Sequence, residues 1–142
     1  MKVELLIPER FEHYWPQIQE MMKRVPHTWE HLTLDSVYSR AMRSSLQVWG
    51  VGDAKQINMV LFTQIACHAS KNVLEVIWAG GNGVLGPVNE VVDATLERFA
   101  WSQNCVDIDV IGREGWERYL SPYGFKKVAV IMSRPVANAR TH

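Results

Sequence analysis

Apolar positions recur along this chain with two different periods, which divide it into predicted helices and predicted strands. From Phe11 to Val25, and again from Leu34 to Met42, apolar side chains return at three- and four-residue steps, as in amphipathic helices. Pro16 lies inside the first stripe, so that helix either kinks at this proline or begins there. Thr33 has the side chain expected of a cap for the second helix.

After Ser45 the period becomes two or the apolar run becomes continuous, which predicts strands. The predicted strands are residues 1–7, 46–51, 57–68, 73–78, 106–111 and 126–133. The nearly continuous apolar run over 57–68 is expected near the centre of a sheet. A third helical stripe runs from Pro87 to Ala100, and a short helix is expected over 114–120. Strands interleaved with helices predict an α/β fold class, in the broad sense that includes α+β.

The overall totals fit a single domain and exclude several function classes. The chain has 142 residues, and we expect one domain over 1–136 with 137–142 as a flexible tail. Lys plus Arg and Asp plus Glu both number 15, which argues against a nucleic-acid partner. No apolar run approaches the roughly 20 residues that span a bilayer, so no membrane partner is expected. Cys67 and Cys105 lack metal-ligand spacing, so we expect no metal, and reduced thiols indicate the cytoplasm.

The order of predicted elements, with one local motif, resembles the GNAT fold of N-acetyltransferases. The motif is Tyr119-Leu120-Ser121-Pro122-Tyr123-Gly124-Phe125, which is similar to the Leu-Tyr-x-x-Leu-Gly-Phe stretch of many family members. The resemblance covers nearly the whole chain. It implies a mixed, mostly antiparallel sheet of about six strands flanked by helices. It also implies that the sheet splays between its fourth and fifth strands, here 73–78 and 106–111, with acyl-coenzyme A in the gap.

A narrower resemblance concerns small GNAT-like proteins of tailed bacteriophages and prophages. The run Gly112-Arg113-Glu114-Gly115-Trp116-Glu117-Arg118 is similar to a segment of that group, as is the corner Trp78-Ala79-Gly80-Gly81. This resemblance implies a phage-encoded protein in the cytoplasm of a host bacterium.

The resemblance also implies a cofactor loop. In the family, a loop resembling Gln/Arg-x-x-Gly-x-Gly/Ala leads into a helix whose open N-terminus favours an anion, so its amides hold the pyrophosphate. This implies acetyl-coenzyme A or another acyl-coenzyme A as cofactor. Trp78 stands where Gln or Arg is expected, and Glu90 would mildly repel a pyrophosphate. The other interpretation is a crossover whose glycines let strand and helix pack closely. In both interpretations the candidate cofactor-binding loop consists of residues Trp78, Ala79, Gly80, Gly81, Asn82 and Gly83.

Glu75 is the candidate general base, because family enzymes often use a glutamate on the fourth or a neighbouring strand and no other acid lies between Val73 and Trp78. The alternative is a solvated strand face that alternates with Leu74 and Val76. The tyrosine that usually serves as general acid is replaced by Leu120. Direct transfer would then need only positioning and an oxyanion-binding N–H.

Asp107 and Asp109 are two residues apart on a predicted strand and therefore share a face. Their paired carboxylates could receive a cationic amine. The other candidate substrate-binding residues are Arg113, at the strand end, and Trp116, beside the expected cleft. The alternative is a salt-linked solvent face involving Arg113.

Two functions follow from these residues. The first is an acyl-coenzyme A-dependent N-acyltransferase that acts on an amine of a small molecule or protein. The second is a non-catalytic phage-encoded GNAT-fold protein that serves in assembly or binds a phage or host protein. If residues 126–133 form an open edge strand, pairing along that edge would give a homodimer.

Overall fold

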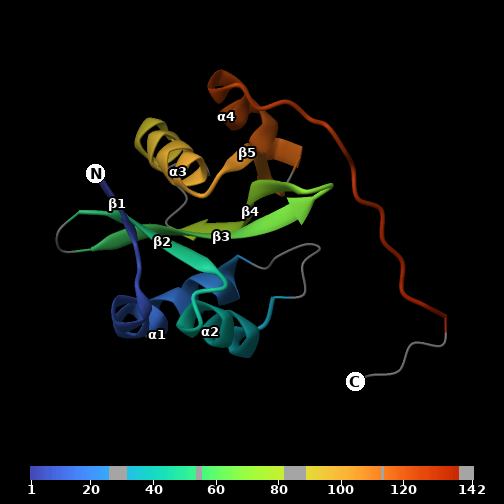
Figure 1. Cartoon of the computed structure of the whole chain (residues 1–142). Helices are drawn as coiled ribbons and strands as arrows, with labels where there is room; N and C mark the ends of the chain where they lie inside the picture. The colour runs from blue at the N-terminus through green and yellow to red at the C-terminus, as the bar shows by residue number, and fades with distance from the viewer. Residues whose placement is uncertain (26–31, 54–55, 82–88, 113, 138–142) are drawn as a thin grey trace.

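The computed structural model describes residues 1–25, 32–53, 56–81, 89–112 and 114–137 (Figure 1). The elements, in chain order, are β1 (Lys2–Leu5), α1 (Pro8–Arg24), α2 (Leu34–Met42), β2 (Gln47–Gly52), β3 (Ile57–His68), β4 (Lys71–Gly81), α3 (Glu90–Ser102), β5 (Cys105–Val110), the 3-10 turn η1 (Glu114–Trp116), α4 (Glu117–Leu120) and the 3-10 turn η2 (Ser121–Tyr123). None of the described helices is long and apolar enough to cross a bilayer.

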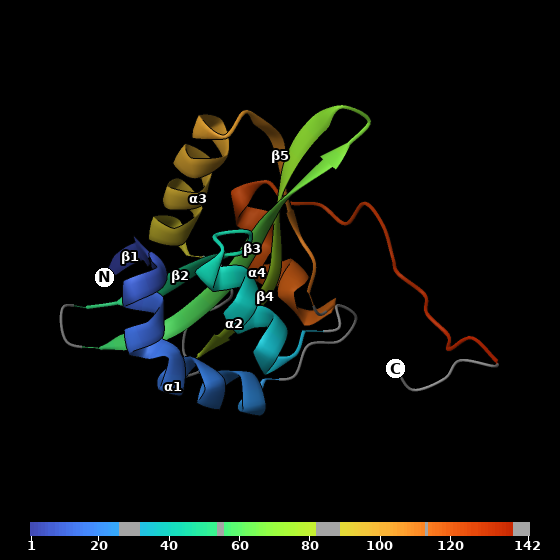
Figure 2. The same ribbon diagram turned by 60° about the horizontal axis from the view of Figure 1, so that its bottom comes forward.

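The strands form one sheet in the order β1-β2-β3-β4-β5. The first three pairings are antiparallel and the pairing of β4 with β5 is parallel. Helices α1 and α2 cover one face of the sheet, and α3 and α4 cover the other (Figures 1 and 2). The predicted α/β class with a mixed, mostly antiparallel sheet is confirmed, and β3 is central as its apolar run predicted.

The prediction of about six strands is wrong by one, because residues 126–133 do not form a strand. These residues are extended and exposed, with no neighbouring strand in the described part of the sheet. The packed body ends at Phe125, which contacts the core under α3.

Two apolar cores form because the sheet is buried on both faces. On the α1–α2 side, Phe11, Ile18 and Val37 have no exposed surface and pack against Phe62. On the α3 side, Val92 and Leu96 pack against strand side chains in the same way. Burying one apolar side chain contributes about 1.5–3 kcal/mol, so these faces hold the helices to the sheet.

The helix ends follow their capping residues. Thr33 caps α2 as predicted, since its hydroxyl accepts from Ser36 N–H at 3.0 Å while Ser36 reciprocates. Helix α1 begins at Pro8 and continues through Pro16, so the interpretation that Pro16 starts the helix is wrong. Helix α3 begins at Glu90, three residues later than the Pro87 start predicted from the apolar stripe.

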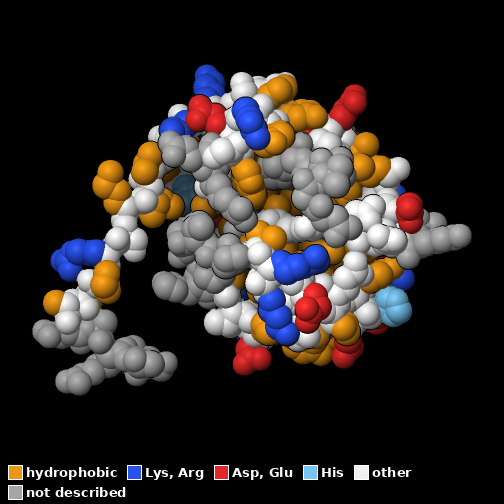
Figure 3. All heavy atoms as spheres, turned by 180° about the vertical axis from the view of Figure 1, so that it is seen from behind, with side chains coloured by type: hydrophobic (Ala, Val, Ile, Leu, Met, Phe, Trp, Pro, Cys, Tyr) orange, Lys and Arg blue, Asp and Glu red, His pale blue; other side chains and the backbone are white. Residues whose placement is uncertain are grey.

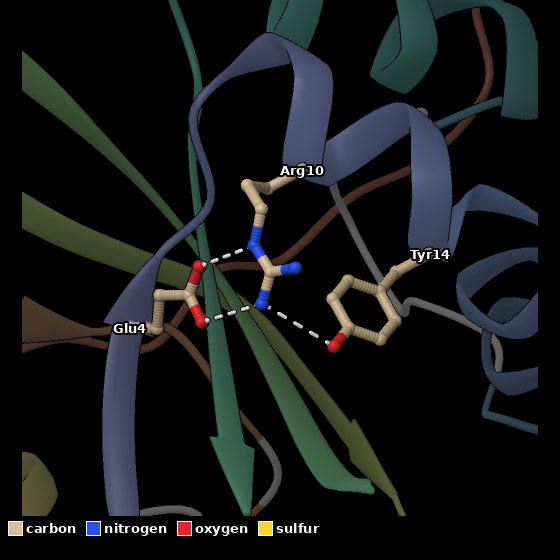
Figure 4. A network of polar contacts seen from close by, with 3 residues as sticks. All are labelled: Glu4, Arg10 and Tyr14. Atoms are coloured by element: carbon tan, nitrogen blue, oxygen red, sulfur yellow. Dashed lines mark hydrogen bonds and ion pairs between the residues drawn. The ribbon is translucent and has the colours of Figure 1, made fainter. Parts of the chain in front are cut away.

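A polar contact joins β1 to α1 (Figure 4). Arg10 donates from Nε to Glu4 Oε2 at 2.9 Å and from Nη2 to Glu4 Oε1 at 3.1 Å, and its guanidinium lies over the ring of Tyr14. This two-pronged hydrogen bond from Arg10 holds the pKa of Glu4 below its usual value. The contact links the edge strand to the first turn of the helix that follows it.

Candidate active site

A bulge in β4 marks the centre of the candidate site. Phe62 pairs with Trp78, but the next residue of β3, Thr63, pairs with Val76, so Ile77 is an extra residue on β4. Ile77 and Trp78 accordingly both pack in the α1–α2 core, whereas Val76 packs under α3. A bulge bends its strand and increases the local twist, and it often occurs beside active sites.

Strands β4 and β5 separate directly at this bulge. Their parallel register ends at Val76 and Val110, and the last backbone bond is from Ile111 N–H to the carbonyl of Val76 at 2.9 Å. Beyond it, β4 continues to Gly81 with β3 as its only strand neighbour among the described residues. The sheet therefore presents the outer backbone edge of β4 at this point. The splay expected between 73–78 and 106–111 is present.

Glu75 lies one residue before the separation and points to the α1–α2 side, opposite to Leu74 and Val76, as the alternation predicted. Its side chain is only 12% exposed, so it does not lie on the open solvated face that was the alternative interpretation. Oε1 accepts a hydrogen bond from Gln64 Nε2 at 2.8 Å, and Oε2 lies 3.4 Å from Nε2 of His68. The carboxylate is thus held in place by two neighbours.

Sequence reasoning missed the groups that hold Glu75. Gln64 is directly opposite Glu75 in the β3–β4 register, and its Oε1 accepts from Arg40 Nη2 at 2.6 Å. A chain of contacts therefore runs from α2 through β3 to the carboxylate on β4. The available signal was the polar Gln64 within the apolar run of β3, but only the register identifies its partner.

Asp107 and Asp109 share a face, as predicted, and Asp109 pairs in register with Glu75. Burial, then the charges of Asp107 and Glu75, raise the pKa of Asp109, and His68 partly opposes this rise. Within the described residues, no Lys or Arg forms an ion pair with either aspartate. Arg113, the predicted third member, lies outside the described residues. An amine cation placed beside these carboxyl groups would be attracted by all of them.

The predicted cofactor loop begins as strand. Gly80 and Gly81 are the last two residues of β4, and Ala79 is buried, while Asn82 and Gly83 lie outside the described residues. A Cβ at Gly80 would lie 2.4 Å from the ring of Trp78, and one at Gly81 would lie 2.3 Å from the carbonyl oxygen of Asn58. Close packing within the sheet therefore accounts for both glycines.

The ring of Trp78 is part of the α1–α2 core. It is 4% exposed, stacks on Phe62 with ring centroids 4.6 Å apart, and donates its indole N–H to the carbonyl of Val25 at 2.8 Å. Cofactor binding by Trp78 would therefore use its backbone, because the side chain is fully engaged in packing.

The N-terminus of α3 is already capped. Asn89 Oδ1 accepts from the N–H groups of both Val91 and Val92 at 3.0 Å. Glu90 and Asp93 add negative charge to the first turn. Both features reduce the attraction of this helix end for a pyrophosphate.

No tyrosine takes the position of the usual acid. Leu120 is 8% exposed and packs under α3, and the hydroxyl of Tyr119 instead accepts from Arg118 Nη2 at 2.9 Å on the surface. Trp116 lies on η1 and its ring covers Gly112, where an added Cβ would be 2.1 Å from the ring. Trp116 is therefore partly buried and contacts the α3-side core.

The described residues contain no group of three or more His, Cys, Asp or Glu side chains suited to a metal ion.

No family model matches the sequence, and no curated protein matches it. Solved structures do match. A probable acetyltransferase has a TM-score of 0.70 at 11% identity, covering 98% of this chain and 100% of its own.

Two further matches are acetyltransferases whose names state their substrates. An aminoglycoside acetyltransferase from an uncultured soil metagenomic sample has a TM-score of 0.71 at 9% identity, with 95% of both chains covered. Glucosamine-6-phosphate N-acetyltransferase from Arabidopsis thaliana has a TM-score of 0.67 at 10% identity, covering 94% of this chain and 97% of its own. These similarities show that the chain has the GNAT fold.

Proposed function

We propose that this protein is an acyl-coenzyme A-dependent N-acyltransferase that acts on a cationic amine. The observation that carries the proposal is the separation of β4 from β5 directly after a bulge, with Glu75 held one residue away. That arrangement places open backbone groups of β4 beside a fixed carboxylate. Transfer of an acyl group to an amine needs both kinds of group within one site.

Acyl-coenzyme A would supply the acyl group as a thioester. The outer edge of β4 beyond Val76 would orient the thioester, with a backbone N–H donating to its carbonyl oxygen as negative charge develops. Asp107 and Asp109 would attract the ammonium form of the acceptor. Glu75, directly or through water, would take a proton from that amine, which frees its lone pair to attack.

The thiolate of coenzyme A is a good leaving group, so transfer would proceed although Leu120 stands where the general-acid tyrosine is expected. The amine nitrogen would form a bond to the carbonyl carbon as the carbon–sulfur bond breaks, and the electron pair of that bond would stay on sulfur. An alkyl thiol has a pKa of about 8.5, so the thiolate leaves without being protonated in advance. The nitrogen, once bonded to the acyl carbon, would lose its second proton to the thiolate or to solvent, and the proton taken up by Glu75 would pass to solvent.

The described residues suit the thioester end of acyl-coenzyme A better than its pyrophosphate. The edge of β4 suits the thioester end, whereas the capped and acidic start of α3 is a poor anion site. Cofactor contacts by Trp78, Ala79, Gly80 and Gly81 would come from the backbone. Asn82 and Gly83 would contact the pyrophosphate in place of the N–H groups of Val91 and Val92, which already donate to Asn89.

Calorimetric titration with acetyl-coenzyme A, and with free coenzyme A in parallel, tests the proposal. We expect binding at micromolar strength that Gly83→Glu weakens. An amine screen that detects released thiol should then find activity that falls about 100-fold or more in Glu75→Gln. Glu97→Gln, on the exposed side of α3, is the matched control and should keep full activity. Lack of binding at millimolar ligand would refute the proposal.

A second function is favoured by the capped helix and by the side chain of Trp78, both of which remove groups expected in a cofactor site. It is a non-catalytic GNAT-fold protein that binds a phage or host protein. The phage origin rests on the similarity of the run Gly112 to Arg118 to phage proteins. Absence of acyl-coenzyme A binding in the titration above would favour this function.

A further inference from the structure

The side-chain amide of Gln64 lies between a cation and an anion that come from different elements. Gln64 is on β3, opposite Glu75 of β4 in the strand register, and Arg40 reaches it from the last turn of α2. Its Oε1 accepts from Arg40 Nη2 at 2.6 Å, and its Nε2 donates to Glu75 Oε1 at 2.8 Å. Both contacts are partly buried and each has one charged partner, which makes them stronger than hydrogen bonds between neutral groups.

Arg40 determines which end of the Gln64 amide faces Glu75. A guanidinium carries only donors and an ionised carboxylate only acceptors, whereas an amide has one end of each kind. With the amide turned over, its NH2 group would face the guanidinium and its oxygen would face the carboxylate, so both hydrogen bonds would be lost. The orientation that satisfies Arg40 is therefore the one that presents the NH2 group to Glu75.

The charges that orient this amide are local ones. On the face of the molecule in Figure 3, basic and acidic side chains of the described residues are interspersed, with no wide area of one sign. The formal net charge of the chain is zero. Exposed charges are largely screened beyond about 10 Å at 0.1 M salt. The field at the Gln64 amide is therefore set by its two neighbours, Arg40 and Glu75.

The backbone of Arg40 is held in place where α2 leads into β2. Its carbonyl oxygen accepts from the N–H groups of Ser45 and Leu46 at 2.9 and 3.3 Å. These bonds tie the end of the helix to the residues just before the strand. The guanidinium therefore extends toward Gln64 from a fixed point.

We propose that Gln64 and Arg40 are positioning residues for Glu75, and that Oε2 of Glu75 takes the proton from the acceptor amine. Gln64 occupies Oε1, which leaves Oε2 facing Nε2 of His68 at 3.4 Å. The side chain of His68 is 59% exposed, and exposed side chains change rotamer within nanoseconds, so the amine can take its place. The nitrogen keeps the electron pair of the broken N–H bond. This inference rests on the proposed function, in which Glu75 is the general base.

Steady-state kinetics of thiol release test the proposal, with acetyl-coenzyme A, the most active amine of the screen, and the variants Arg40→Met and Gln64→Leu. We expect each variant to lower kcat about tenfold or more, because a misplaced reacting group slows the chemical step. The KM for acetyl-coenzyme A should change less than about twofold, since neither residue lies at the outer edge of β4.

Two further variants of α2 test the reason for the loss. Arg40→Lys should recover most of the activity that Arg40→Met loses, because an ammonium also carries only donors. Arg43→Met is the matched control, since Arg43 is exposed at the C-cap of the same helix, and it should keep full activity.

A double substitution separates positioning from damage to the fold. In the Glu75→Gln background, Arg40→Met should lower the remaining kcat less than about twofold, because a residue that acts through Glu75 then has no base to position. NMR of the unliganded protein reports the orientation of the amide. Cross-relaxation should connect the side-chain amide protons of Gln64 with the γ-methylene protons of Glu75, and Arg40→Met should remove it.

The outcomes separate this inference from the proposed function. Activity that Glu75→Gln removes but Arg40→Met leaves unchanged would overturn the inference and leave the proposed function standing. So would an equal loss on Arg40→Met with and without Glu75, an Arg40→Lys variant as slow as Arg40→Met, or amide contacts that Arg40→Met leaves intact. A wild type that releases no thiol with any amine would overturn the proposed function, and this inference with it.

Discussion

Glu75 and Asp109 lie opposite each other on the parallel strands β4 and β5, on the same face of the sheet. Two ionised carboxylates at this spacing repel each other, and partial burial adds to the free energy required to charge Asp109. The pKa of Asp109 is therefore raised, with burial as the main cause and Asp107 and Glu75 as further causes. Negative charge concentrated where the strands separate makes the protein's stability depend on pH.

We predict that Asp109→Asn stabilises the protein at neutral pH. The native state binds the Asp109 proton more tightly than the unfolded chain, whose aspartates have a pKa of about 3.9. The free energy of unfolding therefore loses this contribution as pH rises from about 4 through the raised pKa. Urea unfolding at pH 7 should show the variant to be more stable, and the difference should vanish near pH 4.

Substitution of the exposed Asp107 tests how much its charge contributes to the raised pKa of Asp109. Asp107→Asn removes one cause of the raised pKa, so a carboxyl titration by NMR should show the pKa of Asp109 moving down toward its usual value. A gain in stability of Asp109→Asn that was equal at both pH values would contradict the electrostatic explanation.

We predict that Gly81→Ala destabilises the protein by about 1–3 kcal/mol, because the added methyl group would require the backbone to shift. The new Cβ would lie 2.3 Å from the carbonyl oxygen of Asn58 and 2.8 Å from Cα of Met59. Gly115→Ala is the matched control, since nothing lies within 4 Å of its added Cβ. Denaturant unfolding should place the control within about 0.5 kcal/mol of wild type. Equal effects of the two substitutions would refute the packing explanation.

We predict that Trp78→Phe lowers the free energy of unfolding by about 1–3 kcal/mol. The substitution leaves the carbonyl of Val25 without the indole donor and opens space beside Phe62. Trp101→Phe is the control, because that ring is 84% exposed and its loss should change stability by less than about 0.5 kcal/mol. If thermal unfolding ranked the two variants the other way, the assignment of Trp78 to the core would be wrong.

The sequence by itself determined the local elements and their order. The period of apolar residues located α1, α2, β2, β3 and β5 closely, because each element buries one stripe or face and its residues must repeat accordingly. Thr33 identified the start of α2, since its side chain satisfies a backbone donor in the same turn. These features depend on residues within a few positions of each other.

Its errors occurred where long-range contacts decide the outcome. Gly80 and Gly81 were interpreted as loop, yet they extend β4 because β3 pairs with them and the ring of Trp78 covers Gly80. Residues 126–133 have the alternation of a strand, but a strand forms only with a partner, and the body provides none beside them. Local pattern does not contain that information.

For the candidate site, the sequence supplied the chemistry and the tertiary structure supplied the geometry. Glu75, Asp107 and Asp109 were identified from residue type and spacing. Only the register between β3, β4 and β5 showed that Gln64 holds Glu75 and that Asp109 lies beside it. The bulge at Ile77 and the end of the β4–β5 pairing at Val76 were likewise visible only in the strand register.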